Sequence, residues 1–559
     1  MLKKINVDRI VKNAKVFTSD KNNLHATSFA VKDGKFVYVG NEEGIKDYEG
    51  EVVDMGGKFV MPSIIDSHIH IVTSVMMDSG MKPVWIMCEG KKDCLDFIAK
   101  YISENPELGA YRFMLNKSNL LGEKLIKEEL DVICKDKAIV IQESECHSAW
   151  VNSKIMNDAG ITDETPDIAK GLSYYEKDEK GHKTGYMVEM TVARALGGIF
   201  SNNISNEKIR ESLKSWIDFS VKHGETAVFE AGTPGGVKFH EKVYDALKDM
   251  DEKGELPILV DGSYAICDPA ELDGAMEILR HFKKKFNSKH MRFNTLKIVL
   301  DGTMRVHTAY MLSPYVGTDC IGGRLFNERQ IADIIKMINA EGFDLHIHTV
   351  AEGAARTALD GVELAQKELG KDFHTQVTLA HLELVHNDDI IRFKKLGVFA
   401  NYTPWWHYGD CGDGNLEEAV KMLGKERANN LYRCKSVYDT GANVCFSSDS
   451  VMFDFQYWNP YLGMEVAMCR QMTEKTKVAD MFKRPTAFPQ ENEKMSIEEC
   501  ILCYTINNAK QLGIADKKGS IEVGKDADFA IFNQNLLTKD KEGFSHVMPE
   551  EVYLEGKKF

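Results

Sequence analysis

The middle of this 559-residue chain alternates short apolar runs with amphipathic stretches, and that alternation limits the folds open to it. Most of the apolar runs are continuous in Val, Ile, Leu and Phe, which is typical of strands buried on both faces of a parallel sheet. Helical stretches such as 329–340 and 351–369 separate the runs. The predicted strands are residues 226–230, 258–264, 296–300, 344–349, 376–381, 398–402 and 444–448.

An eighth strand is predicted in the stretch 60–70, which reads Val-Met-Pro-Ser-Ile-Ile-Asp-Ser-His-Ile-His. Eight strand–helix units predict an α/β fold of the (β/α)8 TIM-barrel type. The active site of such a barrel lies at the carboxyl ends of its strands. The residues that end each predicted strand are therefore the first candidates for chemistry.

Both ends of the chain follow a different pattern, with short strands and tight turns. Asp33-Gly34 separates two alternating apolar runs, which is a strong hairpin signal. The C-terminal region returns to similar runs, so we expect a small β-sandwich domain formed by both termini. Inside the barrel we expect an insertion that contains one extra strand, 138–142. The predicted domains are 1–62 (sandwich, N-terminal part), 63–508 (TIM barrel with an insertion at about 73–200) and 509–559 (sandwich, C-terminal part).

Composition excludes several classes of partner. The formal net charge of −15 argues against nucleic acid and against anionic membrane surfaces. No run approaches the roughly 18 apolar residues of a membrane helix, and the first residues do not form a secretory leader. The 12 cysteines have no framework spacing, so we expect reduced thiols in a cytoplasmic protein. Cys500 and Cys503 lie in one predicted helix, 496–512, where helix packing is the simplest interpretation.

His68 and His70 are one residue apart at the end of the first barrel strand. Side chains alternate along a strand, so both imidazoles point to the same side. Two imidazoles placed in this way can bind one divalent metal ion. The pair alone is equally compatible with ordinary histidines, and the case for a metal depends on the other strands.

Polar residues that can bind a metal recur at the ends of those other strands. Lys297 lies in the fourth strand, and Asp301 follows it. The remaining strand ends supply three histidines and one carboxylate, which are His346 and His348 (fifth strand), His381 (sixth) and Asp449 (eighth). A barrel would bring all of them to one end.

Motifs distributed over nearly the whole chain resemble the amidohydrolase superfamily, and within it the amidohydrolase-3 branch of YtcJ-like metal-dependent hydrolases. Ser63 replaces a glycine that is usual in the first motif. The motifs are Gly57-Lys-Phe-Val-Met-Pro-Ser-Ile-Ile-Asp-Ser-His-Ile-His70, His147-Ser-Ala-Trp-Val-Asn-Ser153, Thr184-Gly-Tyr-Met-Val-Glu189, Leu296-Lys-Ile-Val-Leu-Asp-Gly302, His348-Thr-Val-Ala-Glu352, Ala380-His-Leu-Glu-Leu-Val385, Phe446-Ser-Ser-Asp449 and Lys518-Gly-Ser-Ile-Glu-Val-Gly-Lys-Asp-Ala-Asp-Phe529.

The resemblance implies a set of metal ligands. His68 and His70 would hold the more buried metal with Asp449, and His348 and His381 the second. Lys297 would be carbamylated by carbon dioxide and bridge both ions, because a carbamate is an anionic oxygen ligand whereas an ammonium is not. We expect two Zn²⁺ per chain, with Mn²⁺ or Fe²⁺ as alternatives. An unmodified Lys297 in a one-metal site is the competing interpretation. Spacing alone does not choose between His346 and His348; the family motif favours His348.

The implied reaction is hydrolysis of a non-peptide C–N bond in an amide, an N-substituted formamide or a cyclic amide. A divalent ion lowers the pKa of bound water toward about 7 and so provides hydroxide. Asp449 would take the water's proton and return it to the leaving nitrogen. One alternative is hydrolytic deamination of a heterocycle, and a remote one is a barrel that binds ligands without catalysis.

Substrate contacts are predicted from the loops. His147 matches a family motif and is a candidate to hydrogen-bond the reacting carbonyl, with a structural histidine as the alternative. The loop of Trp405, Trp406 and His407 would line the pocket, although ordinary loop packing explains it as well. Further predicted substrate contacts, from the motifs, are Glu189 and Asp301. The expected partners are a small-molecule substrate and a second copy of the chain in a homodimer.

Overall fold

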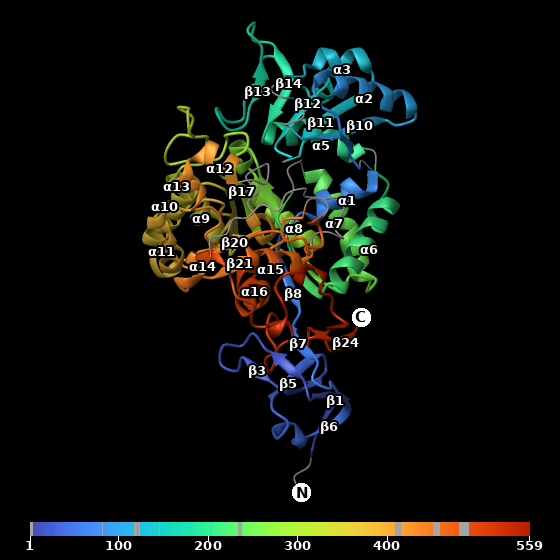
Figure 1. Ribbon diagram of the computed structural model, residues 1–559, viewed down its shortest axis with the longest axis vertical. Coiled ribbons are helices and arrows are strands. Elements are labelled where there is room, and N and C mark those ends of the chain that lie inside the picture. The colour runs from blue at the N-terminus through green and yellow to red at the C-terminus, as the bar shows by residue number, and fades with distance from the viewer. Residues whose placement is uncertain are drawn as a thin grey trace.

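The computed structural model describes residues 4–80, 82–116, 120, 123–144, 146–202, 204–232, 237–408, 416–450, 459–479 and 491–559. Figure 1 shows three regions along the long axis of the molecule. The barrel lies in the middle, a β-rich region that carries the N-terminus lies at one end, and a second sheet region lies at the other.

The middle region is an eight-stranded sheet in which neighbouring strands run parallel. This confirms the predicted (β/α)8 fold. The apolar runs form these strands because both of their faces are buried. In sheet order the strands are β8 (Ile64–Ile69), β15 (Glu225–Glu230), β16 (Leu259–Ile266), β17 (Met291–Val299), β18 (Asp344–Thr349), β19 (Val377–His381), β20 (Phe399–Tyr402) and β21 (Val444–Phe446).

The two ends of this sheet order, β8 and β21, meet through the segments that carry the metal-ligand candidates. The backbone N–H of Asp449 donates to the carbonyl of His68 over 2.8 Å, and that of His70 donates to Ser450 over 3.0 Å. Below them, the side chain of Asn508 donates to the carbonyl of Phe446 over 2.7 Å. The closure of the barrel therefore fixes the first and last strand ends against each other.

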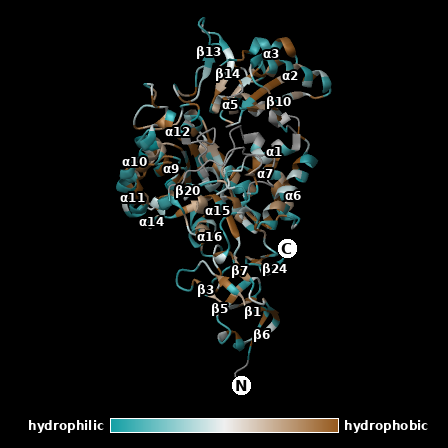
Figure 2. Ribbon diagram, viewed as in Figure 1, coloured by the Kyte–Doolittle hydropathy of each residue, from teal (hydrophilic) through white to brown (hydrophobic). Residues whose placement is uncertain are grey.

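Amphipathic helices surround the sheet, with their hydrophobic residues turned toward it (Figure 2). Helix α9 begins at a capping box in which Asn327 and Gln330 exchange side-chain and backbone hydrogen bonds. The helices around the barrel are α6 (Asn206–Lys222), α7 (Val237–Glu252), α8 (Ala275–Phe286), α9 (Glu328–Asn339), α10 (Glu352–Leu369), α11 (Asn387–Leu396), α14 (Cys434–Asp439), α15 (Pro460–Cys469), α16 (Ile497–Tyr504) and α17 (Ile506–Gln511).

The prediction of one continuous helix over 496–512 is wrong. Thr505 has φ −123° and ψ −95°, and it separates α16 from α17. Its hydroxyl donates to the carbonyl of Ile501 over 2.6 Å and contacts the hydroxyl of Ser19 over 2.9 Å. A side chain that hydrogen-bonds its own preceding turn competes with the helix ladder. Cys500 and Cys503 are buried free thiols in α16, as the packing interpretation predicted.

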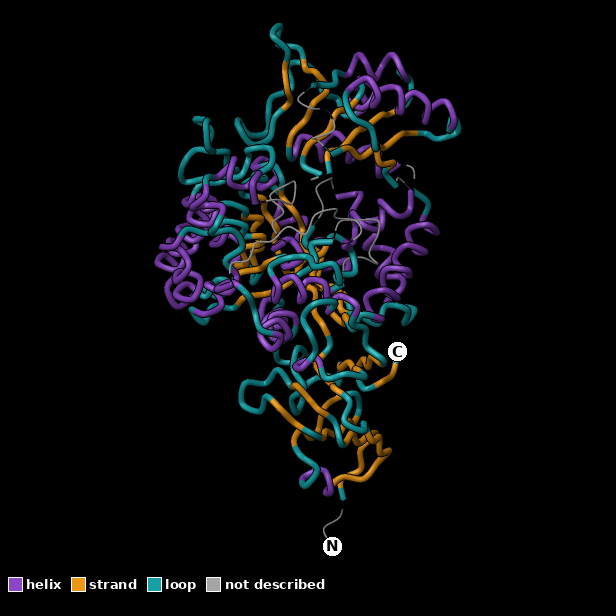
Figure 3. The backbone as a smooth tube through the Cα atoms, viewed as in Figure 1, coloured by secondary structure: helices purple, strands orange, loops and turns teal. Residues whose placement is uncertain are grey.

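The insertion after α1 (Ile71–Gly80) is larger than the one extra strand that was predicted. It forms a six-stranded sheet with a separate apolar core on each face. Figure 3 shows the strands of this sheet in orange, at the end of the molecule away from the N-terminus. Two of its strands are only three residues long, too short to give a clear periodic signal. In sheet order they are β13 (Tyr175–Lys177), β14 (Lys183–Val188), β12 (Ser148–Val151), β11 (Ala138–Glu143), β10 (Ala110–Leu115) and β9 (Val84–Ile86), with helices α2 (Lys91–Glu104), α3 (Lys127–Ile133), α4 (Ser153–Asp158) and α5 (Met190–Asn202).

The opposite end of the molecule combines strands from both termini. The hairpin predicted at Asp33-Gly34 is confirmed, because Lys32 and Lys35 pair across it and Gly34 has φ 76°. One sheet has the order β5-β4-β1-β6, and a second has the order β24-β23-β22-β7-β2-β3. In the second sheet, β7 (Phe59–Pro62) runs antiparallel to β22 (Phe529–Phe532). The other strands are β1 (Ile5–Lys12), β2 (Lys15–Phe17), β3 (His25–Ala26), β4 (Ser28–Lys32), β5 (Lys35–Gly40), β6 (Tyr48–Asp54), β23 (Glu551–Leu554) and β24 (Lys557–Lys558).

No helix in the described part of the chain combines the length and the apolar character that crossing a membrane requires. The cysteines within those ranges are free thiols.

Candidate metal centre

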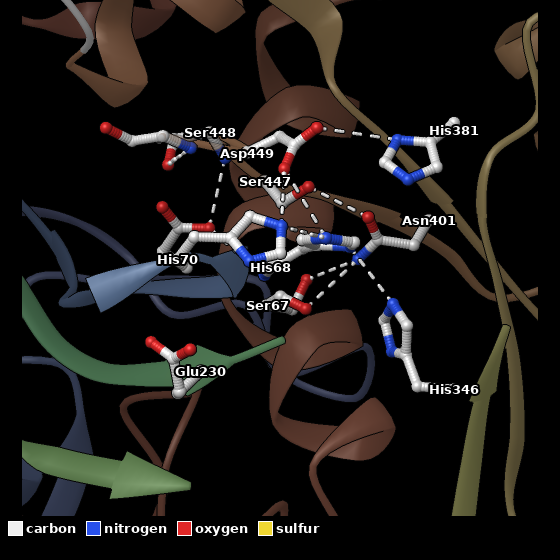
Figure 4. A network of polar contacts seen from close by, with 12 residues as sticks. Ser67, His68, His70, Glu230, His346, His381, Asn401, Ser447, Ser448 and Asp449 are labelled. Carbon is white, nitrogen blue, oxygen red and sulfur yellow. Dashed lines mark hydrogen bonds and ion pairs between the residues drawn. The ribbon is translucent and has the colours of Figure 1, made fainter. Parts of the chain in front are cut away.

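Three side-chain atoms converge where β8 and β21 end (Figure 4). Nε2 of His68 lies 3.4 Å from Nε2 of His70 and 3.4 Å from Oδ1 of Asp449. Nε2 of His70 lies 3.3 Å from the same carboxylate oxygen. Two imidazoles and a carboxylate that face one point are ligands suited to a divalent transition metal.

His381 joins this group from the end of β19. Its Nδ1 lies 3.5 Å from Oδ2 of Asp449, so the two oxygens of that carboxylate face different histidines. One ligand atom from each of His68, His381 and Asp449 falls within a mutual distance of 4.8 Å. Both ring nitrogens of His381 are buried without a hydrogen-bond partner in the described structure. Buried polar atoms normally have partners, and a metal ion would supply one here.

Residues of this group have strained backbone. His381, Leu382 and Asp449 have φ values of 79°, 49° and 46°, in the left-handed region that non-glycine residues rarely adopt. Such a conformation costs on the order of 1–3 kcal/mol per residue and is concentrated at functional sites. The strain sets the direction in which the His381 and Asp449 side chains leave the strand ends.

The two histidines of β18 have different surroundings. Nε2 of His346 lies 3.0 Å from Nδ1 of His68, and its ring stacks on Phe229. His346 therefore contacts Nδ1 of His68, and Nε2 of His68 faces His70 and Asp449. His348 makes a hydrogen bond with the backbone of Gly302, its ring lies 4.3 Å from that of His381, and its buried Nε2 has no partner among the described groups.

Lys297 lies in the adjacent strand, in register with His346. It is 4% exposed, and burial lowers the pKa of its ammonium to about 8. Within the described ranges its amine makes no hydrogen bond or ion pair. A buried lysine with a lowered pKa is neutral a larger fraction of the time than an exposed lysine is. The neutral amine is the form that reacts with carbon dioxide.

Burial also keeps three of the candidate ligands, His68, His348 and His381, neutral. It is the largest cause that holds the pKa values of His68, His348 and His381 well below their usual range. The charge of Lys297 acts in the same direction on all three. Neutral imidazole is the form that binds metal, so these three side chains are in the protonation state that a metal ligand needs.

Two carboxylates that were not singled out from the sequence hold the ligand segments in place. Glu230, at the end of β15, accepts the backbone N–H groups of Ile71 and Val72, directly after His70. Oδ1 of Asp66 accepts the backbone N–H groups of His68 and Ser448, over 3.2 and 3.0 Å. Burial raises their pKa values, to about 7 for Glu230 and about 6 for Asp66. Their positions, at a strand end and within the first motif, were the available sequence signals.

His147 comes from the insertion and faces the barrel. Its ring centroid lies 6.1 Å from that of His348, and its Nδ1 lies 2.6 Å from Oε2 of Glu189. The other oxygen of Glu189 accepts from the Thr308 hydroxyl over 2.5 Å and from the Thr303 N–H over 3.1 Å. Glu189 is 3% exposed, so protein groups surround the carboxylate that was predicted as a substrate contact.

Asp301 is likewise buried and held by the protein. Its carboxylate accepts the backbone N–H groups of Tyr310, Val350 and Ala351 over 2.8 to 3.0 Å. Burial raises its pKa to about 7. These contacts give Asp301 a part in organising the loops around β17 and β18.

The predicted aromatic loop makes three different contacts. Trp406 stacks on His381, with ring centroids 5.5 Å apart and an angle of 12° between the planes. Nε1 of Trp405 donates to the carbonyl of Ser448 over 2.7 Å, next to Asp449. His407 is fully buried and stacks on Tyr432. Of the three, Trp406 lies against a metal-ligand candidate.

Comparison with known proteins adds to this geometry. A family model described as "Amidohydrolase family" matches residues 51–558. The chain is 25% identical over 411 residues to the "Exoenzymes regulatory protein AepA" of Pectobacterium carotovorum subsp. carotovorum, a match that covers 71% of this chain and 85% of that protein. It is 22% identical to the "N-substituted formamide deformylase" of Arthrobacter pascens, over 94% of each chain.

A solved structure has the same fold. The structure of "an uncharacterized metal-dependent hydrolase" from Pyrococcus horikoshii OT3 superposes with a TM-score of 0.68 at 22% identity. The superposition covers 95% of this chain and 99% of that one.

Proposed function

The chain belongs to the amidohydrolase family, and from that premise we propose that it hydrolyses an N-substituted formamide or a related amide at the His68–Asp449 centre. The chain is a metal-dependent hydrolase of carbon–nitrogen bonds. The observation that carries the proposal is the convergence of His68, His70, His381 and Asp449 at one end of the barrel. The formamide class is suggested by the relative that matches 94% of the chain.

The residues present fit a metal ion. Buried atoms that lack a partner in the described structure include Nε2 of His348, both ring nitrogens of His381 and Oδ1 of Asp449. We assign His68, His70 and Asp449 to one divalent ion and His348 and His381 to a second, with Zn²⁺ as the expected metal. A bound ion would activate water for attack and polarise the substrate carbonyl.

Lys297 is proposed to bridge the two ligand sets as a carbamate. It lies on β17, the neighbour of the strand that carries His348, is buried, and is in register with His346. The ammonium first loses a proton to give the neutral amine, and the amine then adds to carbon dioxide and releases a second proton. The product is a carbamate, which is an anionic oxygen ligand.

Two side chains of this protein would handle the proton and the developing charge. Asp449 would accept a proton from the attacking water and later deliver it to the leaving nitrogen, as a general base and then a general acid. His147, whose ring lies 6.1 Å from that of His348, would hydrogen-bond the oxygen that becomes negative during attack. Trp406 would form an aromatic wall beside His381.

The test is turnover by the metal-loaded protein. Formanilide should be split by water into formate and aniline; a chelator should stop the reaction, and Zn²⁺ should restore it. Hydrolysis of succinimide in the same assay tests for activity on cyclic amides. Release of ammonia from adenine tests the deaminase alternative. Protein that has bound metal and releases ammonia from adenine, but splits neither amide, would contradict the proposal.

We also propose a cytoplasmic homodimer. Multi-angle light scattering on the purified full-length chain should give twice the monomer mass of 63.0 kDa. A mass equal to that of the monomer at micromolar concentration would contradict the dimer.

A further inference from the structure

We propose that Glu189 is a positioning residue that fixes the orientation and the tautomer of His147, and that the loop after β17 holds Glu189 in place. The part played by His147 in the reaction rests on the function proposed above. The arrangement of Glu189 and its partners stands on the contacts alone.

Glu189 holds His147 through both its backbone and its side chain. Its backbone N–H donates to the carbonyl of His147 over 2.6 Å, and its Oε2 lies 2.6 Å from Nδ1 of the same residue. Glu189 adopts this double contact with φ 58°, a left-handed conformation that is costly for a glutamate. A buried carboxylate next to an imidazole normally fixes the ring's direction.

The second oxygen of Glu189 is held by the barrel. Oε1 accepts the Thr303 N–H and the Thr308 hydroxyl, both from the loop after β17. That loop approaches so closely that a Cβ atom on Gly302 would lie 2.3 Å from Oε1 and 2.3 Å from the Thr308 hydroxyl oxygen. Gly302 also makes the backbone hydrogen bond to His348. One short segment thus orients a metal-ligand candidate and, through Glu189, the histidine of the insertion.

These contacts determine the tautomer of His147. A carboxylate can only accept hydrogen bonds, so Nδ1 of His147 must carry the proton that it shares with Glu189. Nε2 is then the ring nitrogen without a proton. A bare Nε2 cannot donate, so His147 donates to the developing negative charge as an imidazolium that has taken a second proton from solvent at Nε2. The negative charge of Glu189 stabilises this cation, whereas the neutral amide of E189Q does not.

Replacement of Glu189 by glutamine should give the opposite tautomer of His147. Thr303 presents a backbone N–H, which can only donate, so the amide oxygen of Gln must take the Oε1 position. The amide NH₂ then faces Nδ1 of His147 and donates to it. In E189Q, His147 should therefore carry its proton on Nε2 and have a bare Nδ1, with almost unchanged side-chain volume.

The first test needs no substrate. Nitrogen-15 NMR of histidine-labelled, Zn²⁺-loaded full-length protein distinguishes the two tautomers, and the spectrum of H147Q assigns the His147 signals. We expect a protonated Nδ1 in the wild type and a protonated Nε2 with a bare Nδ1 in E189Q. A bare Nδ1 in the wild type, or the same His147 signals in both proteins, would overturn the inference.

A matched control lies elsewhere in the chain. His290 has the same kind of contact, with Nδ1 2.7 Å from Oδ1 of Asp251, and neither residue belongs to the proposed centre. D251N should change the His290 signals and leave those of His147 and the turnover of formanilide unchanged. Altered His147 signals in D251N would show that the method reports general perturbation and would overturn the assignment.

Kinetics separate a positioning role from a merely structural one. With formanilide, E189Q should lower kcat at least tenfold with KM within about twofold. In an H147Q background the same substitution should cost almost nothing more, because Glu189 acts through His147. Full additive loss in the double variant would overturn the positioning role. Failure of the wild type to split formanilide would instead count against the proposed function, and the NMR result would still decide the inference.

Discussion

Asp449 is the residue at which the two ligand sets meet, because its two oxygens face different histidines. Its left-handed backbone, with φ 46°, is a conformation that asparagine tolerates well. D449N should therefore fold normally while losing the charge that binds metal and accepts a proton. We expect turnover of formanilide to fall by about 10²–10⁴-fold, with a melting temperature near that of the wild type.

The control for this variant is D333N, which removes a charge on the exposed face of α9. Turnover by D449N close to that of D333N would remove Asp449 from proton transfer.

Lys297 gives a prediction about metal content. K297A removes the proposed carbamate, so elemental mass spectrometry should find about one ion per chain fewer than in the wild type. K183A is the matched control, because Lys183 is 1% exposed and lies in the insertion, where its ammonium donates to carbonyl oxygens. Equal metal content in the wild type and K297A would leave Lys297 as an unmodified lysine.

The lowered pKa values of three histidines predict how metal binding depends on pH. Burial holds the folded pKa values of His68, His348 and His381 well below the usual value of 6.5. Groups with lowered pKa values are still deprotonated at pH 6, so protons should compete weakly with the metal there. We expect dialysis at pH 8 and at pH 6 to leave the same metal content, with loss only at lower pH. Release with a midpoint near pH 6.5 would mean that the ligands titrate as exposed histidines do.

At the scale of elements, the closure of the barrel depends on few groups. The Asn508 side chain of α17 donates to the carbonyls of Ile65 and Phe446, and its oxygen accepts from the Ser67 hydroxyl. N508A would remove one hydrogen-bond partner from each of these buried groups, and a buried group left unsatisfied costs about 1–3 kcal/mol. We expect urea unfolding to show a loss of about 3 kcal/mol or more.

N430A provides the comparison, since Asn430 donates only to an exposed carbonyl on a short helix. Equal destabilisation of N508A and N430A would show that the closure does not rely on α17.

The elements also show what the sequence can and cannot predict. The barrel strands were predictable because strands buried on both faces are uninterrupted apolar runs, and β18 has the bounds that were predicted. The sheet of the insertion was missed because β9 and β13 are three residues long and owe their shape to neighbouring strands. The histidines and Asp449 were found by their place at strand ends. The supporting roles of Glu230 and Asn508 depend on contacts between residues 62 or more positions apart, which no local pattern encodes.

At the scale of the whole molecule, the terminal sheets and the insertion are joined to the barrel in different ways. Phe59 and Phe532 belong to the same continuous apolar core as the barrel, and Phe532 packs against Tyr461 of α15. The insertion instead has two apolar cores of its own, one of which contains Phe113. Its links to the barrel include Leu172 and Met190, which belong to the barrel core, and the polar contacts of Glu189 with Thr303 and Thr308.

This difference predicts two kinds of thermal unfolding. F532A and F113A each remove a buried aromatic ring, at a cost of about 3–5 kcal/mol. In F532A the substitution weakens a core that the barrel and the terminal sheets have in common. Calorimetry should therefore show one main transition for both regions, at a lower temperature than in the wild type. In F113A a separate, earlier transition should appear as the insertion unfolds. Above that transition the metal should remain bound, because its proposed ligands lie in the barrel, whereas turnover should be lost with His147. Identical single transitions in both variants would show that the insertion and the barrel unfold together.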